Sequence, residues 1–300
     1  MLKREVSCCP LSRRAVVALC VGAALAVLTM LPGVGRAAAM SDSEFDRLCA
    51  AGTAEQVRQA LKEGANPNAR DELGGTALMS AVRRWEERER LETTRALLSA
   101  GADVNARDEM GGTALIEAAP SCDAEVARLL LDGGANVNAR DKYGWTALMK
   151  VGSPDETEQE PTDEACLATA RALLAAGADV NLQAESGASA LSELWNRGAV
   201  FRALLDAGAN VNQRNQAGRT PLMSAAAEGS PDAVRTLLNA GADPSLKDND
   251  GHDAAWSVRH EYEEEYDYEG AEQEAARNRA AIIRLLQGGG ANKPAAKKKR

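Results

Sequence analysis

The chain has 300 residues, of which 45% are apolar and 26% are charged, and its formal net charge is −9. These values are typical of a folded globular protein and exclude a disordered or fibrous chain. Only 3% of the residues are aromatic, so alanine, leucine and valine supply most of the apolar content, which favours packed helices over a β-sandwich or β-barrel. The two histidines, His252 and His260, leave little for histidine-based catalysis or a histidine-rich metal centre.

Residues 1–39 are typical of an export signal. Basic residues precede an uncharged, mostly apolar segment from Ala15 to Val34, and three alanines just before Met40 form a candidate cleavage site. We therefore expect the mature chain to begin near Met40 and to be periplasmic or secreted. The alternative is an uncleaved leader that anchors the protein in the inner membrane, facing the periplasm, because about 20 apolar residues can span a bilayer. Arg13 and Arg14 resemble a twin-arginine signal without its usual Phe-Leu, so the export route stays open.

The charge of the exported part narrows the choice of partner. Removal of the leader, which carries five basic residues and one acidic residue, changes the formal net charge from −9 to −13. The basic tail at residues 293–300, which we expect to be disordered, leaves the rest of the chain still more acidic. An acidic body repels phosphate backbones, so we expect no nucleic-acid partner. Contact with a membrane is expected only if the leader is retained.

One phrase recurs along the chain. Gly-Ala-Asn-Pro-Asn-Ala-Arg-Asp at residues 64–71 returns in related form at Gly101, Gly134, Gly177, Gly208 and Gly241. A second phrase of the form Gly-x-Thr-Ala-Leu follows shortly after each of the first five copies, beginning at Gly74, Gly111, Gly144, Gly187 and Gly218. The basic period is roughly 33 residues, with longer intervals at two places, and such a period indicates a repeat fold.

The two phrases together resemble the ankyrin repeat, whose units read Asp-x-x-Gly-x-Thr-Pro-Leu-His-x-Ala and then Leu-Leu-x-x-Gly-Ala-Asp-Val-Asn. The resemblance implies an all-α repeat fold, an ankyrin solenoid of about seven helix-turn-helix units over residues 40–292, with short turn or hairpin connections. Capping units are expected near residues 42–71 and 248–292. The family's histidine is replaced by another residue in every unit, so we expect its hydrogen bond to be absent and apolar packing to substitute at Met79, Ile116, Met149, Ser192 and Met223.

The fifth copy explains the repeat in physical terms. Thr220 is suited to cap a first helix, and Pro221 fits the first position of that helix. Ser230 and the proline after it predict the start of a second helix in the same way. Gly241 lies where a left-handed residue would end the second helix. Two short helices with one apolar stripe cannot bury it alone, so neighbouring units are expected to stack.

Three units are longer than the others, and their extra residues fall between the two helices, at residues 85–92, 152–164 and 259–274. The last of these insertions contains eight acidic residues and three tyrosines. We interpret it as a solvated loop, with an acidic, aromatic patch for a basic partner as the alternative.

Motifs that carry chemistry are missing from the sequence. The Asp-Asn-Asp-Gly run at 248–251 resembles a calcium loop, but that alignment puts Leu246 and Ser257 at ligand positions, so the ligand set fails. The sequence contains no phosphate-binding glycine loop and no Gly-x-Ser-x-Gly, His-Glu-x-x-His or Cys-x-x-Cys motif. We therefore expect a protein that is not an enzyme and that binds no cofactor or metal.

Three of the six cysteines would leave with a cleaved leader. Cys49 follows Phe45 at helical spacing and is expected in the core. Cys122 and Cys166 occupy nearly equivalent places in neighbouring units. Stacked units are about 10 Å apart, which is too far for a disulfide, but both cysteines lie beside loops, so pairing stays open.

In proteins of this kind the concave face, made by the turn tips and the first helices, holds the partner. The resemblance therefore implies these partner-binding positions: Glu72, Leu73, Glu109, Met110, Lys142, Tyr143, Trp145, Gln216 and Arg219 at the tips, and Arg83, Arg84 and Glu228 on helices. Trp145 follows a turn glycine and, with Tyr143, is interpreted as an interface anchor. The alternative is that Trp145 only covers the side chains of its neighbours. Trp195 and Trp256 are expected inside first helices, in the core.

These expectations favour a non-catalytic protein–protein interaction module in the bacterial cell envelope, monomeric and bound to one protein partner. The identity of that partner stays open. A membrane-anchored structural spacer is the alternative if the leader is not cleaved, and an envelope enzyme is the third and weakest hypothesis.

Overall fold

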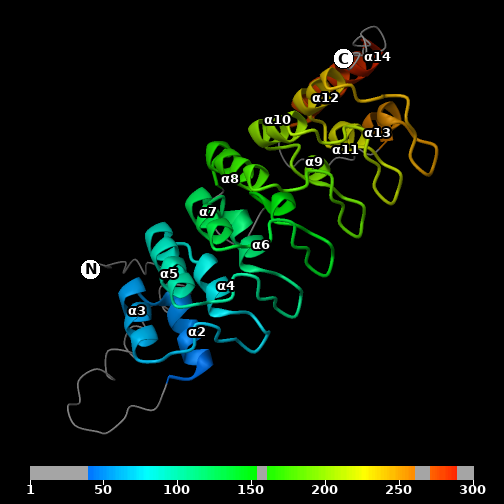
Figure 1. The fold of residues 1–300 in the computed structure, drawn as a ribbon. Helices are drawn as coiled ribbons and strands as arrows, with labels where there is room; N and C mark the ends of the chain where they lie inside the picture. Colours follow the sequence, from blue (N-terminus) through cyan, green and yellow to red (C-terminus); the bar gives the residue numbers. More distant parts are fainter. Residues whose placement is uncertain (1–39, 154–160, 261–270, 289–300) are drawn as a thin grey trace, which may run out of the picture. The chain divides into compact units, whose positions relative to one another are not determined.

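A computed structural model describes residues 40–153, 161–260 and 271–288 (Figure 1). The expected leader and the basic tail lie outside these residues, as do residues 154–160 and 261–270 of two of the insertions. The chain divides into two compact units, Met1–Asp103 and Val104–Arg300.

The described residues are helical, as the repeat pattern predicts. They contain no strand, and the antiparallel pair Arg70 and Thr76 forms an isolated bridge. Among the helices of these residues, none combines the length and the hydropathy needed to cross a membrane.

The first unit consists of two helix pairs, α2 (Asp42–Ala51) with α3 (Ala54–Lys62) and α4 (Ala77–Val82) with α5 (Glu87–Ser99). Helix α2 packs against α4 and α3 packs against α5, so the two pairs stack on each other. Each helix contributes at least one fully buried side chain to the core between them: Phe45, Val57, Leu78, Met79 and Leu97. The apolar stripe of each pair is therefore covered by its neighbour, as stacking requires.

The second unit has the same kind of arrangement within itself, with its helices in two rows (Figure 1). The first helix of each pair is α6 (Ala114–Ala118, continued by η1, Ala119–Ser121), η2 (Leu148–Lys150), α9 (Ala190–Glu193), α11 (Pro221–Ala227) or α13 (Ala254–His260). The second helix is α7 (Ala124–Asp132), α8 (Asp163–Ala175), α10 (Gly198–Asp206), α12 (Pro231–Asn239) or α14 (Ala271–Gly288). Contacts run along each row, α7 to α8 to α10 in one and η2 to α9 to α11 to α13 in the other. The predicted all-α repeat fold is confirmed.

The threonine of the second phrase caps the first helices, as predicted. In α4 and α11 the threonine hydroxyl accepts from the backbone N–H three residues later, at 3.3 Å for Thr76 and 3.4 Å for Thr220. The methionine at that third position is buried, and its sulfur accepts a weak bond of 3.4 Å from the threonine N–H, at Met79 and at Met223. Apolar packing was therefore an incomplete expectation, because the methionine sulfur closes a capping box that normally ends in glutamate or glutamine.

The asparagine at the fifth position of the first phrase joins neighbouring repeats. The Asn138 side chain donates to Gly177 O at 3.1 Å and accepts from Asp179 N at 2.8 Å. Asn105 and Asn181 make the same pair of bonds to the repeats that follow them. The recurrence of this residue therefore has a structural cause, since it satisfies backbone groups at the end of each second helix.

Most of the insertion at 85–92 is helical, because helix α5 begins at Glu87. Helix α5 is 13 residues long, whereas α3, α7, α10 and α12 are 9 residues long, so the extra residues add a turn at its N-terminus. Arg90 in this turn is buried, and its Nε donates to Arg84 O at 2.5 Å. Helix α8, which follows the second insertion, also has 13 residues.

The structure pairs Cys122 and Cys166 in a disulfide, with their Cα atoms 4.6 Å apart. Two features bring these cysteines together although stacked units are about 10 Å apart. Cys122 lies in the turn between η1 and α7 in a left-handed conformation (φ 54°), and Cys166 lies in the extra first turn of α8. Cys49 is free and fully buried, as expected, and burial raises the pKa of its thiol to about 12.

Candidate functional site at the hairpin tips

Each hairpin turn between repeats is built around an Asp-x-x-Gly sequence or a variant of it. At the third full turn, Asp141 Oδ1 accepts from the backbone N–H groups of Tyr143 and Trp145, both at 2.9 Å. Gly144 completes the turn with a φ of +78°, a conformation that side chains disfavour. The turn residues therefore fix the backbone, and the two residues between Asp and Gly are free to vary.

In the second unit the backbones of successive tips are hydrogen-bonded to one another. Lys142 N donates to Met110 O at 2.8 Å, and Glu185 N donates to Tyr143 O at 2.7 Å. The series continues with Gln216 N to Ser186 O at 3.1 Å and Asn249 N to Ala217 O at 3.0 Å. These bonds order the exposed ends of the hairpins before any partner arrives, which lowers the entropic cost of binding.

The recurrent arginine of the first phrase supports the same row. Arg140 Nη2 donates to Gln183 O at 2.5 Å, Arg214 Nη2 donates to Lys247 O at 2.6 Å, and Arg107 bonds in the same way to Arg140 O. Each of these bonds reaches the backbone of the next hairpin. These arginines therefore have a structural role at the base of the tips.

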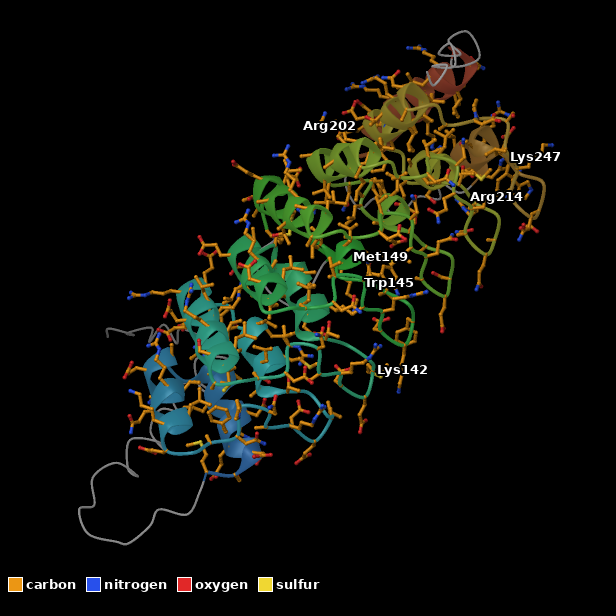
Figure 2. The ribbon with its side chains drawn as sticks, in the orientation of Figure 1. Lys142, Trp145, Met149, Arg202, Arg214 and Lys247 are labelled. Carbon is orange, nitrogen blue, oxygen red and sulfur yellow. A yellow bond between two sulfur atoms is a disulfide. The ribbon has the colours of Figure 1, made fainter. Side chains whose placement is uncertain are left out.

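Exposed apolar side chains gather on this row. Met110 is 46% exposed and Tyr143 is 54% exposed, on neighbouring hairpins joined by the bond between Lys142 N and Met110 O. Trp145 is half-buried, and Figure 2 shows it nearer to the helices than Lys142, which lies towards the end of the hairpin. We refer to Met110, Lys142, Tyr143 and Trp145 as the tip surface. Its mixture of rings, a thioether and a charged amine suits a protein interface.

The other sequence-predicted positions lie at several places. In the second unit Glu109, Gln216 and Glu228 are exposed and Arg219 is half-buried. In the first unit Glu72, Leu73 and Arg83 are exposed, with Leu73 72% accessible.

Arg84 is the exception, since only 6% of it is exposed. It follows the last turn of α4, and its Nη1 donates to Cys49 O, the carbonyl near the end of α2, at 2.9 Å. Glu86 lies 3.5 Å from the same guanidinium. The expectation that Arg84 faces a partner is therefore wrong, because the side chain is used to join α4 to α2.

The sequence reasoning missed Trp85 as a surface residue. It is 78% exposed, the largest value among the large apolar side chains of the described residues. Its position in the insertion between the two helices, outside the repeat pattern, was the available signal. Trp195 lies beyond the end of α9 and Trp256 lies within α13, and both are half-buried rather than core residues.

The cluster of Asp248, Asp250 and His252 brings three possible metal ligands within 4.8 Å of one another. Asp248 Oδ1, however, accepts from the backbone N–H groups of Asp250 and His252, the same turn that Asp141 makes. The ring of His252 stacks on Trp256, which stacks in turn on His260. Both histidines of the chain are therefore placed by turn formation and ring stacking.

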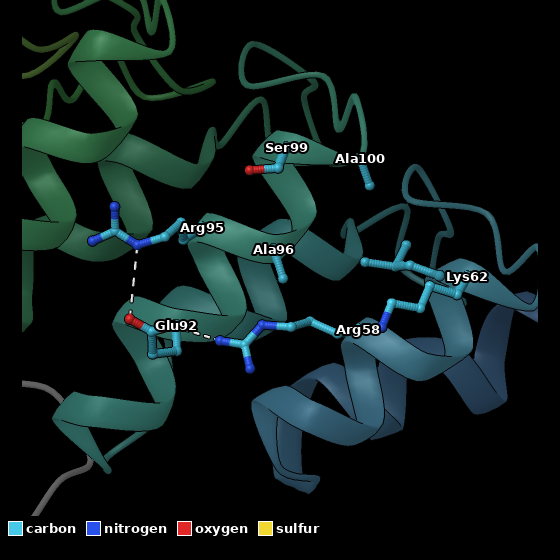
Figure 3. Close-up of a pocket in the computed structure, with 8 residues that line it drawn as sticks. Arg58, Lys62, Glu92, Arg95, Ala96, Ser99 and Ala100 are labelled. Atoms are coloured by element: carbon cyan, nitrogen blue, oxygen red, sulfur yellow. Dashed lines mark hydrogen bonds and ion pairs between the residues drawn. The ribbon is translucent and has the colours of Figure 1, made fainter.

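A groove of about 460 Å³ lies between α3 and α5 in the first unit (Figure 3). Glu92 crosses it with ion pairs to Arg58 at 2.5 Å and to Arg95 at 3.7 Å. These side chains are a third to a half exposed, and exposed ion pairs contribute at most about 1 kcal/mol each. The groove is a charged surface between second helices and brings together no reactive groups.

Stacked helix pairs joined by ordered hairpins define a helical repeat protein that presents its variable residues at the tips. The family model described as ankyrin repeats (3 copies) matches residues 86–151 and 163–248, just over half of the chain. The chain therefore belongs to the ankyrin-repeat family. Ankyrin repeats are protein–protein interaction modules, and their fold is typically a non-enzymatic binding scaffold.

Two solved structures resemble this chain. The ankyrin-repeat domain of Bcl-3, a member of the IkappaB protein family, has a TM-score of 0.60 and 26% identity over 81% of this chain and 97% of its own. An ankyrin-repeat domain from Acinetobacter baumannii AYE has a TM-score of 0.56 and 30% identity over 68% of this chain and 100% of its own. A search of curated proteins finds no match.

Proposed function

We propose that this protein is an exported, non-catalytic binding module of the bacterial cell envelope that holds one protein partner on its tip surface. The observation that carries the proposal is the exposure of Met110 and Tyr143 on hairpins whose backbones are already hydrogen-bonded together. Large apolar side chains that stay exposed on an ordered backbone are typical anchors of an interface. The concave face expected from the resemblance includes these tips.

The charges around the tip surface define the kind of partner. Lys142 and Glu109 flank the apolar side chains with opposite charges, and Gln216 adds an amide two hairpins further along. Such a rim suits a folded protein with a mixed polar surface around a small apolar pocket. The net charge of the whole chain disfavours a nucleic acid.

Two observations support export. Residues 1–39 have the composition of a signal peptide, and the Cys122–Cys166 disulfide is of a kind that persists in oxidising compartments. We propose that the mature protein is a periplasmic or secreted monomer. An intact N-terminus in the membrane fraction would support the anchored spacer instead.

Affinity capture from the envelope, followed by peptide identification, tests the function. The double variant Tyr143→Ala with Trp145→Ala is expected to lose a partner that the wild type retains, with unchanged helical circular dichroism. Trp85→Ala is the matched control, because it removes an exposed ring from outside the tip surface and should retain the partner. Equal capture by the wild type and the double variant would contradict the proposal.

A further inference from the structure

The Cys122–Cys166 disulfide packs against the backbone that follows η2. A Cβ atom added to Gly152 would lie 2.8 Å from Cys166 Sγ and 3.3 Å from Cys122 Sγ. The φ of Gly152 is +63°, and its N–H donates to Ala119 O at 3.4 Å. The two sulfurs therefore form one wall of this turn, and only glycine fits against them.

Arg197 packs against the same turn, with its Nε 3.2 Å from the position of a Cβ added to Gly152. Its Nη2 donates to Gly152 O at 3.0 Å, and its Nη1 donates to Pro161 O at 2.9 Å and lies 3.3 Å from the Asp163 carboxylate. Only 12% of the Arg197 side chain is exposed. Gly152 is thus packed against both the disulfide and a largely buried guanidinium.

A short series of contacts joins this turn to the tip surface. Val151 is buried, and before it Lys150 Nζ lies 3.4 Å from Asp141 Oδ2. The other oxygen of Asp141 accepts from Tyr143 N and Trp145 N. The disulfide, the η2 segment and the exposed rings therefore belong to one connected group of contacts.

This repeat has the shortest first helix among itself and its two neighbours. That helix, η2, is a 3₁₀ turn of 3 residues, whereas α6 before it and α9 after it are α-helices of 5 and 4 residues. A single 3₁₀ turn has little stability of its own and depends on tertiary contacts. Here the sulfurs next to Gly152 supply a fixed contact at the end of the turn.

We propose that oxidation of Cys122 and Cys166 is a maturation step that fixes η2 and the tip surface, so that the binding surface is completed only in an oxidising compartment. The inference rests on the proposed function. In this step an envelope disulfide oxidant takes two electrons and two protons from the two thiols and leaves as a dithiol. Cys122 is 3% exposed and Cys166 is fully buried, so a reductant has little access to the bond once the unit has folded.

Amide hydrogen exchange tests the step and needs no partner. The oxidised wild type is compared with the Cys122→Ser, Cys166→Ser double variant and with wild type purified in the reduced state. We expect exchange in residues 143–152 to accelerate at least about tenfold more than exchange in α12. Cys49→Ser, which removes the buried free thiol, is the control and should change both regions alike.

A second variant tests the connection itself. Lys150→Ala in the oxidised protein removes the ion pair to Asp141 and is expected to accelerate exchange at Tyr143 and Trp145 about threefold or more, while Gly152 stays protected. The proposal is overturned if loss of the disulfide accelerates exchange in residues 143–152 no more than exchange in α12. This holds when both regions accelerate equally and also when neither region changes. An unchanged tip in Lys150→Ala would also overturn it. Because these readouts involve no ligand, a failed capture experiment refutes the proposed function without deciding this one.

Discussion

Ser80 Oγ in α4 donates a 2.7 Å hydrogen bond to Asp46 Oδ1 in α2, and this pair lies at the packed interface of the two helices. Only 9% of Asp46 is exposed. Burial raises the pKa of the Asp46 carboxyl, and the hydrogen bond from Ser80 opposes that shift only in part. The folded protein therefore binds a proton at Asp46 more strongly than the unfolded chain does.

The raised pKa predicts a pH-dependent stability difference between wild type and Asp46→Asn. Below the ordinary pKa of aspartate, about 3.9, the carboxyl is protonated in both states and costs nothing. As the pH rises through the raised pKa of the folded protein, the Asp46 carboxyl ionises in a buried place and the wild type loses stability. Asparagine keeps an acceptor for Ser80 and does not ionise, so the variant does not lose this stability. Urea unfolding from pH 3.5 to 7 should therefore shift the free-energy difference in favour of Asp46→Asn. A difference that does not vary with pH would contradict the assignment.

The buried Arg84 predicts a stability effect where the sequence predicted a binding effect. Arg84→Ala removes the donor to Cys49 O and leaves a buried carbonyl without that bond, which is expected to cost about 1–3 kcal/mol. Arg83→Ala changes an exposed neighbour and should cost less than about 1 kcal/mol. Chemical denaturation of both variants gives the comparison. Equal losses would show that the inward position of Arg84 contributes nothing.

The contrast between Arg83 and Arg84 shows where sequence reasoning stops. The repeat period, the threonine caps and the apolar face of each first helix follow from local spacing, so the fold was predictable from the phrases around Thr76 and Thr220. The direction of a side chain just past a helix end depends on where the previous repeat places a carbonyl, which no local pattern contains. The same holds for Cys122, whose left-handed turn brings it to Cys166 against the average spacing of repeats.

The hairpin tips, too, were only partly predictable from the sequence. That the residues between Asp and Gly vary freely could be read from the phrase, and Leu73, Met110 and Tyr143 are indeed exposed. The bonds from Lys142 to Met110 and from Glu185 to Tyr143 join hairpins of different repeats, far apart in the sequence, so only the stacked structure reveals them. Trp85 escaped notice because the pattern of the family has no position for an inserted residue.

The thiol of Cys49 is expected to be unreactive in the folded protein. Its pKa of about 12 means that almost no thiolate is present at pH 8, and the side chain is fully buried. Alkylation of Cys49 with iodoacetamide should therefore proceed only under unfolding conditions, with a rate that follows the unfolded fraction across a urea titration. Rapid labelling of Cys49 in buffer alone would show that α2 opens readily.

Two glycines with similar positive φ angles separate the cost of backbone strain from the cost of steric contact. Gly134 (φ +87°) has nothing within 4 Å of an added Cβ, so Gly134→Ala should cost only the left-handed conformation, about 1 kcal/mol. Gly144 (φ +78°) would place its Cβ 2.6 Å from Arg140 Nη2 and 3.1 Å from Glu185 N. Gly144→Ala should therefore cost at least about 2 kcal/mol, because the hairpin must move away from its neighbour.

Displacement of this hairpin would also weaken the bond from Glu185 N to Tyr143 O, so the loss in Gly144→Ala should appear as faster amide exchange at Glu185 as well as a lower urea midpoint. Gly134→Ala should lower the midpoint slightly and leave the Glu185 amide unchanged. If the two variants have equal midpoints and equal exchange at Glu185, the tips are not in close contact. In that case the ordered row, which is the physical basis of the proposed binding surface, does not exist in solution.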